Sequence, residues 1–159
     1  FVFNNGKNEE KPYVRIHSQC ITGDLFHSLK CDCGSQLDEA INFLSDKNGM
    51  ILYMSQEGRD IGFLNKMRAY SYQETGLNTI EANHAIGFDS DQRNFEYASS
   101  ILKSLNILSI RLISNNPDKK KIIEQDGIKV VELLPLKVSI TKEAKNYINI
   151  KKDLMGHSL

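Results

Sequence analysis

The sequence predicts a single compact α/β (α+β) domain in which helices flank a mixed β-sheet, and three observations lead to it. The chain has 159 residues, the size of one ordinary domain with a real core. Apolar residues make up 40% and charged residues 25%, without a collagen-like or disordered bias. Short apolar runs alternate with segments whose apolar residues recur at helical spacing, so one α/β domain is expected over residues 1–159.

The expected strands are short, and the first long one has two different faces. They are placed at residues 1–3, 13–17, 50–54, 107–113 and 128–134, with an extended piece at 137–140. Val14 and Ile16 share one face of the second strand, while Arg15 and His17 share the other. That other face must meet either solvent or a site. The run at 50–54 is continuous enough for a strand buried on both faces, and 107–113 is expected to be a second buried strand.

The expected helices follow from apolar spacing and from capping residues. They are placed at residues 25–29, 35–48 with Ser35 as N-cap, 63–76 with an apolar side of Phe63, Met67 and Tyr70, 91–105 with Asp91 as N-cap, and 117–127 after an Asn116 N-cap. Residues 77–92 are expected to form a long polar connection, of the kind that often carries function. Residues 141–159 form a basic, amphipathic tail.

All three cysteines lie within fourteen residues, which requires a chemical reason. An odd number leaves one thiol over in any disulfide scheme, and Cys31 and Cys33 are too close for an unstrained bridge. Thiolates suit zinc, and three protein ligands with an open fourth position are typical of a catalytic zinc site. We interpret Cys20, Cys31 and Cys33 in this way.

Two other interpretations of the cysteine cluster stay open at this point. A structural zinc site could be completed by His17, His27 or His84, or the cysteines could be small buried residues without a metal. His17 is the nearest of these histidines in the sequence. It is disfavoured, because positions three apart in a strand face opposite sides.

Two stretches are candidate anion sites. Residues 55–62 form a glycine-bearing turn between a strand and a helix, where backbone N–H groups can hold an anion. Lys119, Lys120 and Lys121 lie in the first turns of a helix, whose dipole prefers negative charge there. A phosphate would remove that conflict. An ordinary capped turn and a solvated run of charge are the plain alternatives.

Composition argues against several classes of protein. Twenty basic and twenty acidic residues give no net charge, and no basic stripe is interleaved with aromatic residues, which disfavours a nucleic-acid-binding protein. No apolar run approaches the roughly eighteen residues of a membrane span, and reduced cysteines fit the cytoplasm. Because the chain opens with Phe1 in place of methionine, we expect a fragment of a longer chain.

Seven motifs, taken together and in order, resemble GTP cyclohydrolase II. They are Arg15-Ile16-His17-Ser18-Gln19-Cys20, Thr22-Gly23-Asp24, Cys31-Asp32-Cys33-Gly34, Gln56-Glu57-Gly58-Arg59, Lys66-Met67-Arg68-Ala69-Tyr70, Glu81-Ala82-Asn83-His84 and Ser114-Asn115-Asn116-Pro117. The resemblance runs from Phe1 to about His157. It departs at Gln19, where the family usually carries glutamate, and in N-terminal strands that are missing or shortened. Both a standalone enzyme and the C-terminal part of a bifunctional chain remain open.

The resemblance implies a zinc-dependent, homodimeric hydrolase that opens riboflavin biosynthesis. Such an enzyme converts GTP to 2,5-diamino-6-(5-phospho-D-ribosylamino)pyrimidin-4(3H)-one, formate and pyrophosphate. It implies one zinc ion per chain on Cys20, Cys31 and Cys33 with water in the fourth place, and magnesium on the triphosphate. The implied GTP contacts are Arg15, Ile16, His17, Ser18, Gln19, Gln36, Glu57, Gly58, Arg59, Thr79, Ser114 and Lys119. The implied catalytic residues are Asp91 as base, Arg93 as nucleophile and Tyr70 beside the purine.

Elementary chemistry refines some of these roles. A guanidinium has a pKa above about 12, so we expect Arg93 to stabilise charge at phosphorus while Asp91 orients it or activates water. Three thiolates make zinc a weak Lewis acid, and Tyr70 is our candidate for orienting water or donating a proton. Glu57 is expected to accept from the guanine ring, so that its replacement by alanine lowers GTP use far more than folding. The alternative function is a catalytically silent, zinc-stabilised guanine-nucleotide-binding module.

Overall fold

The computed structural model describes residues 1–4, 10–138, 144 and 148, and the extended piece after 138 and nearly all of the basic tail lie outside this range. The elements are β1 (Val2–Phe3), β2 (Tyr13–Ser18), α1 (Ile21–Asp24), α2 (Cys33–Leu44), β3 (Gly49–Met54), α3 (Glu57–Asp60), α4 (Phe63–Glu74), α5 (Thr79–Ala85), α6 (Glu96–Ser104), β4 (Ser109–Ile113), α7 (Pro117–Gln125) and β5 (Lys129–Leu134). The strands form one sheet in the order β1-β3-β2-β4-β5. Strand β1 runs antiparallel to β3 and the other pairs are parallel, which confirms the mixed sheet flanked by helices.

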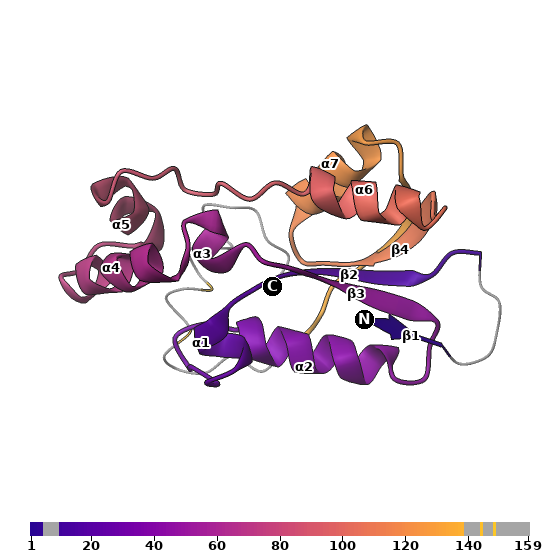
Figure 1. Ribbon diagram of the computed structural model, residues 1–159. Coiled ribbons are helices and arrows are strands. Elements are labelled where there is room, and N and C mark those ends of the chain that lie inside the picture. Colours follow the sequence, from indigo (N-terminus) through magenta and orange to yellow (C-terminus); the bar gives the residue numbers. More distant parts are fainter. Residues whose placement is uncertain (5–9, 139–143, 145–147, 149–159) are drawn as a thin grey trace.

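Each face of the sheet carries its own apolar core. Helices α6 and α7 cover one face, and α2 covers the other (Figure 1). Val14 and Ile16 of β2 are fully buried in the first core with Leu102 of α6. Ala40 and Leu44 of α2 form the second core. The alternation expected for β2 is therefore confirmed.

The carboxyl ends of β2 and β3 lie side by side at one end of the sheet. Ser18 is paired with Met54 at the last position of their register. The loops that follow therefore start together, and they carry α1 and α3, with α4 and α5 beyond them (Figure 1). In open α/β sheets, ligands bind outside the carboxyl ends of parallel strands. This end of the sheet is the place to look for a site.

Two helix predictions near the cysteines are wrong. Residues 25–29 are not helical, and the apolar side chains of Leu25 and Phe26 are 66% and 69% exposed. The helical turn comes earlier, at α1, and the positive φ of 52° at His27 prevents its continuation. Helix α2 begins at Cys33 after Asp32, two residues before the expected N-cap at Ser35.

Two predictions in the middle of the chain are also wrong. The polar connection contains α5, whose capping box pairs the Asn78 side chain with the backbone N–H of Glu81, and the Glu81 side chain with the backbone N–H of Asn78. Asp91 does not cap α6, which begins at Glu96, where the side chain of Asn94 accepts the backbone N–H. The Asn116 cap and Pro117 start of α7 are confirmed. Among the described residues, no helix combines the length and apolar character needed to cross a membrane.

Candidate functional site

The three cysteines meet where β2 ends and α2 begins. The Sγ atoms of Cys20, Cys31 and Cys33 all lie within 4.8 Å of one another, and those of Cys20 and Cys31 are 3.7 Å apart. Two sulfurs on a tetrahedral zinc ion with Zn–S bonds of about 2.3 Å are separated by about 3.8 Å. The spacing is too long for a disulfide and fits a shared zinc ion. No histidine joins this group within the described residues, so the closed Cys3His alternative is not formed there.

Close backbone packing creates the cysteine cluster. Gly23 of α1 faces all three cysteines, since a Cβ atom there would lie 3.1 Å from Cys31 Sγ and 3.2 Å from Cys20 Sγ. Gly34, in the first turn of α2, packs on the carbonyl of Gly23, and a Cβ at Gly34 would lie only 2.3 Å from that oxygen. Two glycines in contact thus let α1 and α2 approach closely enough to gather the sulfurs.

Gly34→Ala is therefore expected to destabilise the fold by about 3 kcal/mol or more, because backbone atoms of α1 and α2 would have to separate. Urea unfolding measures the loss. Ser35→Ala, at the next and exposed position of α2, is the control and should change the free energy of unfolding by less than about 0.5 kcal/mol. Equal stability of the two variants would contradict the close contact.

A buried lysine adjoins the cluster on the side of α4. The Lys66 ammonium donates to Glu57 Oε1 at 2.8 Å, to Thr22 Oγ1 at 2.8 Å and to Cys20 Sγ at 3.1 Å. Burial works to lower the pKa of Lys66, but Glu57 and Cys20 more than offset it and raise that pKa. Hydrogen bonds from the Cys31 and Cys33 thiols, together with the Lys66 charge, lower the pKa of Cys20. The apolar side expected for α4 is wrong: Phe63 is exposed, Met67 and Tyr70 are half-buried, and the buried residues of the helix are Lys66 and Ala69, because Lys66 has acceptors on that side.

Glu57 is engaged by groups of the protein. Its Oε1 atom accepts from Lys66 and from the backbone N–H of Gly58 at 3.0 Å, and its Oε2 atom accepts from the backbone N–H of Ile21 at 2.6 Å. Arg59 donates to the carbonyl of Ser90 at 3.0 Å. The carboxylate is 7% exposed and ties α3 to the residue after Cys20.

Glu57→Ala should therefore lower the free energy of unfolding by about 3 kcal/mol, because it leaves the Lys66 ammonium buried without its carboxylate. Glu74→Ala is the matched control: Glu74 pairs with Lys30 on the surface, where a pair contributes about 0–1 kcal/mol. Urea unfolding compares the two. A stable Glu57→Ala protein impaired only in GTP use would instead support Glu57 as the guanine acceptor.

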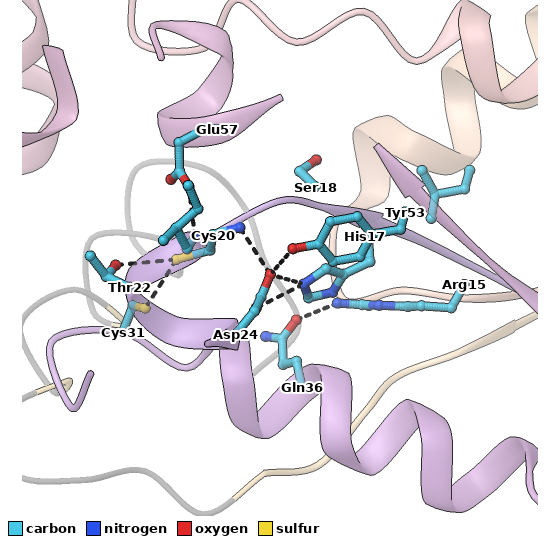
Figure 2. Close-up of polar contacts among 12 residues, drawn as sticks. Arg15, His17, Ser18, Cys20, Thr22, Asp24, Cys31, Gln36, Tyr53 and Glu57 are labelled. Carbon is cyan, nitrogen blue, oxygen red and sulfur yellow. Dashed lines mark hydrogen bonds and ion pairs between the residues drawn. The ribbon is translucent and has the colours of Figure 1, made fainter. Parts of the chain in front are cut away.

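A second polar network lies beneath α1, on the face of β2 that also carries Arg15 (Figure 2). Asp24 accepts from the backbone N–H of Cys20 at 2.9 Å and from the Tyr53 hydroxyl at 2.7 Å. His17 Nε2 lies 3.1 Å from the same carboxylate, and its ring stacks on Tyr53 with 5.5 Å between centroids. Burial lowers the pKa of His17, against the pull of Asp24. His17 therefore helps to position the loop of Cys20 and is not part of the cysteine cluster that could hold a metal.

Arg15 is held by α2 in the same layer (Figure 2). Its Nη2 atom donates to Gln36 Oε1 at 2.6 Å, and Gln36 in turn donates to Asp32 at 2.6 Å. Burial lowers the pKa of Arg15 to about 10, while the charges of Cys33 and Asp32 oppose this. The second face of β2 thus meets a buried polar site, one of the two possibilities that the alternation left open.

A cavity of about 650 Å³ opens beside the cysteines, within the range of small-molecule sites. Arg93 reaches it from the segment before α6, with Nη1 3.4 Å from Ser18 Oγ and Nε 2.8 Å from Asp91 Oδ1. Burial alone would raise the pKa of Asp91, but the hydrogen bonds and charge of Arg93 more than offset this and lower it. Arg59, at a left-handed φ of 63° that is uncommon outside glycine, also lines the cavity. Two arginines and three cysteines therefore line the same cavity.

The structure brings most of the predicted site residues to this cavity. Those that line it are Ser18, Gln19, Cys20, Cys31, Cys33, Glu57, Gly58, Arg59, Tyr70, Thr79 and Arg93. Burial raises the pKa of Tyr70, which keeps the phenol protonated near neutral pH. Asp91 is not part of the lining, but it accepts hydrogen bonds from Arg93, which is. The other six predicted residues outside the lining are Arg15, Ile16, His17, Gln36, Ser114 and Lys119.

These six positions are all buried. Lys119 is buried and donates to the carbonyl of Ile16 at 2.8 Å. It is therefore not part of a solvated run of charge, which was the alternative for the three lysines of this helix. The Ser114 hydroxyl turns back to the backbone of Asn116. Residues that sequence reasoning did not assign to the site are Asp24, Tyr53 and Lys66. Lys66 carried one usable signal, because it lies one helical turn before Tyr70 and shares its face.

Comparison with known proteins agrees with this geometry. The family model described as GTP cyclohydrolase II matches residues 1–135. The riboflavin biosynthesis protein RibBA of Endomicrobium trichonymphae is 46% identical over 154 residues, covering 96% of this chain and 38% of that protein. The GTP cyclohydrolase-2 of Aliivibrio fischeri is 46% identical over 159 residues, covering 99% of this chain and 79% of that protein. The GTP cyclohydrolase-2 of Picrophilus torridus is 43% identical over 171 residues, covering 99% and 89%. The chain thus spans less than two fifths of the first relative and most of the other two.

Proposed function

The chain belongs to the GTP cyclohydrolase II family, and from this premise we propose that it hydrolyses GTP to 2,5-diamino-6-(5-phospho-D-ribosylamino)pyrimidin-4(3H)-one, formate and pyrophosphate, the first step of riboflavin biosynthesis. One observation carries the proposal: the three clustered cysteines and Arg93 line the same cavity. The reaction breaks bonds at the guanine imidazole ring and at the α-phosphate, so it needs a site with two different ends.

The cysteine end fits the guanine ring. Cys20, Cys31 and Cys33 would hold one zinc ion, which supplies an activated water and polarises a carbonyl when bound. Tyr70 lines the same part of the cavity with its phenol protonated, so it can donate a proton or orient water. Asp24 holds the backbone of Cys20 and thereby keeps its sulfur directed at the cavity.

The arginine end fits the triphosphate. Arg93 and Arg59 offer two fixed positive groups to phosphate oxygens, and magnesium would bind the triphosphate because it prefers phosphate oxygens and water to a protein cage. Asp91 orients Arg93 through its hydrogen bonds to the guanidinium. A protonated guanidinium stabilises charge at phosphorus more readily than it attacks it.

The strand end between these two groups would hold the nucleoside. Arg93 donates to Ser18, two residues before Cys20 in the chain, and Ser18, Gln19, Gly58 and Thr79 all line the cavity. The chain would act as a homodimer in the cytoplasm, where reducing conditions keep three thiols available.

The test is direct. The purified chain is incubated with GTP, zinc and magnesium, and formate and pyrophosphate are measured separately, with ATP as the control nucleotide. Formate and pyrophosphate are both expected with GTP, and neither is expected with ATP. GTP binding without either product would identify the silent nucleotide-binding module, and formate without pyrophosphate would place the defect at the arginine end. If the chain neither binds GTP nor forms either product, the proposal is refuted.

A further inference from the structure

Lys66 occupies an unusual position for a lysine. Its residue is 7% exposed, in the first turn of α4, and its three ammonium protons have three acceptors: a carboxylate, a hydroxyl and a sulfur. Lysine is almost never so deeply buried unless it is paired. Glu57 supplies the pairing, but it does not explain why the ammonium also lies 3.1 Å from Cys20 Sγ.

We propose that Lys66 is a positioning residue of the metal centre: it donates a hydrogen bond to the Cys20 thiolate and neutralises part of the negative charge of a three-thiolate zinc site. This inference rests on the proposed function, in which these cysteines hold zinc. It assigns a task to a residue that has no role among the implied contacts with GTP. Outer contacts of this kind orient metal ligands and tune the metal.

The contacts of Glu57 show that Lys66 is part of a clamp on one ligand. The Glu57 carboxylate accepts from the backbone N–H of Ile21, the residue after Cys20, while Lys66 contacts the sulfur of Cys20 itself. Thr22 Oγ1 completes the group and lies 3.6 Å from the same sulfur. Groups from α3 and α4 thus fix the backbone and the side chain of Cys20 together.

Charge gives the clamp a chemical consequence. Zinc with three thiolates has a formal charge of minus one, and strong donation from sulfur weakens the metal as a Lewis acid. An ammonium that donates to one sulfur withdraws electron density from it and offsets the excess charge. Tyr70 lies on the same side, with Lys66 Nζ 5.8 Å from its ring centroid, so the donor and the proposed proton source share α4.

The experiment measures metal binding in the absence of GTP. Lys66→Met alone would leave the Glu57 carboxylate buried without its cation. The comparison is therefore between Glu57→Gln and the double variant Glu57→Gln/Lys66→Met. In this pair the ammonium is removed while residue 57 is neutral in both proteins. Zinc affinity is determined by competition with a chromophoric chelator. The double variant should bind zinc about 10- to 100-fold more weakly than Glu57→Gln. Lys30→Met is the control. It removes another ammonium that lies 5.1 Å from the centroid of the Tyr70 ring but pairs with Glu74 on the surface. Its zinc affinity should change by less than about threefold.

A second measurement separates this role from a merely structural one. With cobalt in place of zinc, loss of the hydrogen bond raises the energy of the sulfur lone pairs, so the sulfur-to-cobalt charge-transfer band should move to longer wavelength. Equal zinc affinity and an unmoved band would overturn the proposal. If the double variant does not fold, Lys66→Gln in the Glu57→Gln background gives the same comparison with an amide in place of the ammonium. Failure of the parent chain to bind zinc would instead refute the proposed function.

Discussion

Cys31→Ser is expected to lose zinc and to lower formate release by about a thousandfold or more. A serine hydroxyl stays protonated near neutral pH and is a poor ligand for zinc, so two thiolates would remain. The metal contributes several kcal/mol of transition-state stabilisation, and each 1.4 kcal/mol corresponds to about a tenfold change in rate. Bound zinc is counted by elemental analysis and formate is measured in the same samples.

Position makes Cys31 the most informative of the three cysteines. It is half-buried in the segment before α2, so its replacement should disturb packing less than a change at the buried Cys20. The neighbouring Thr22 and Lys66 groups contact Cys20 rather than Cys31. Ser28→Ala, in the same exposed loop, is the control and should retain both zinc and formate release. Full zinc content with normal formate release in Cys31→Ser would refute the cysteine cluster as the metal site.

Arg93→Met should lower pyrophosphate release by about a thousandfold while zinc content stays unchanged. A positively charged group that stabilises a transferring phosphoryl group contributes on this order. The expected signature is a fall in the turnover number, since the charge matters most in the transition state. Arg93→Lys should recover only part of the activity, because a lysine cannot reproduce the two-pronged contact with Asp91.

A second arginine provides the control for this substitution. Arg111 also stacks on an aromatic ring, with Cζ 4.9 Å from the Tyr13 centroid, and pairs with Glu132. In Arg93 the corresponding distance to the Phe95 centroid is 5.1 Å. Arg111→Met removes the same charge outside the cavity and should leave pyrophosphate release within about twofold. A nucleotide trapped covalently on Arg93 would contradict its role in charge stabilisation and favour it as nucleophile.

Local patterns predicted the layers of the fold well. The alternation in β2 and the apolar runs of β3 and β4 are confirmed, because these strands lie between two helical layers and meet apolar side chains on both faces. Strand β5 also forms, but at the edge of the sheet, where Val131 and Leu133 are exposed. The Asn116–Pro117 start of α7 is confirmed because capping is a short-range interaction. Helix α5, with its capping box of Asn78 and Glu81, lies in the polar connection expected at 77–92, and the prediction missed it.

The wrong predictions depend on contacts between distant segments. Leu25 and Phe26 suggested a helix by composition, yet the chain there is shaped by the contact of α1 with α2. Lys66 was left out of the site because burial of an ammonium depends on partners from Thr22, Glu57 and Cys20, up to 46 positions away. A prediction from apolar spacing assigns polar side chains of a helix to the solvent side, so it cannot identify a buried ion pair.

The sequence by itself determined the chemistry of this protein: three clustered cysteines, an arginine beside an aspartate, and the motifs that place the chain in its family. Covalent spacing is enough to bring Cys31 and Cys33 together. Only the tertiary structure decided that Cys20 joins them, that Arg93 reaches Ser18, and that Lys66 contacts a sulfur. The reason is contact between segments: Gly34 packs on Gly23 and gathers the cysteines, while the aligned ends of β2 and β3 place the loop of Cys20 beside the segment that carries Lys66.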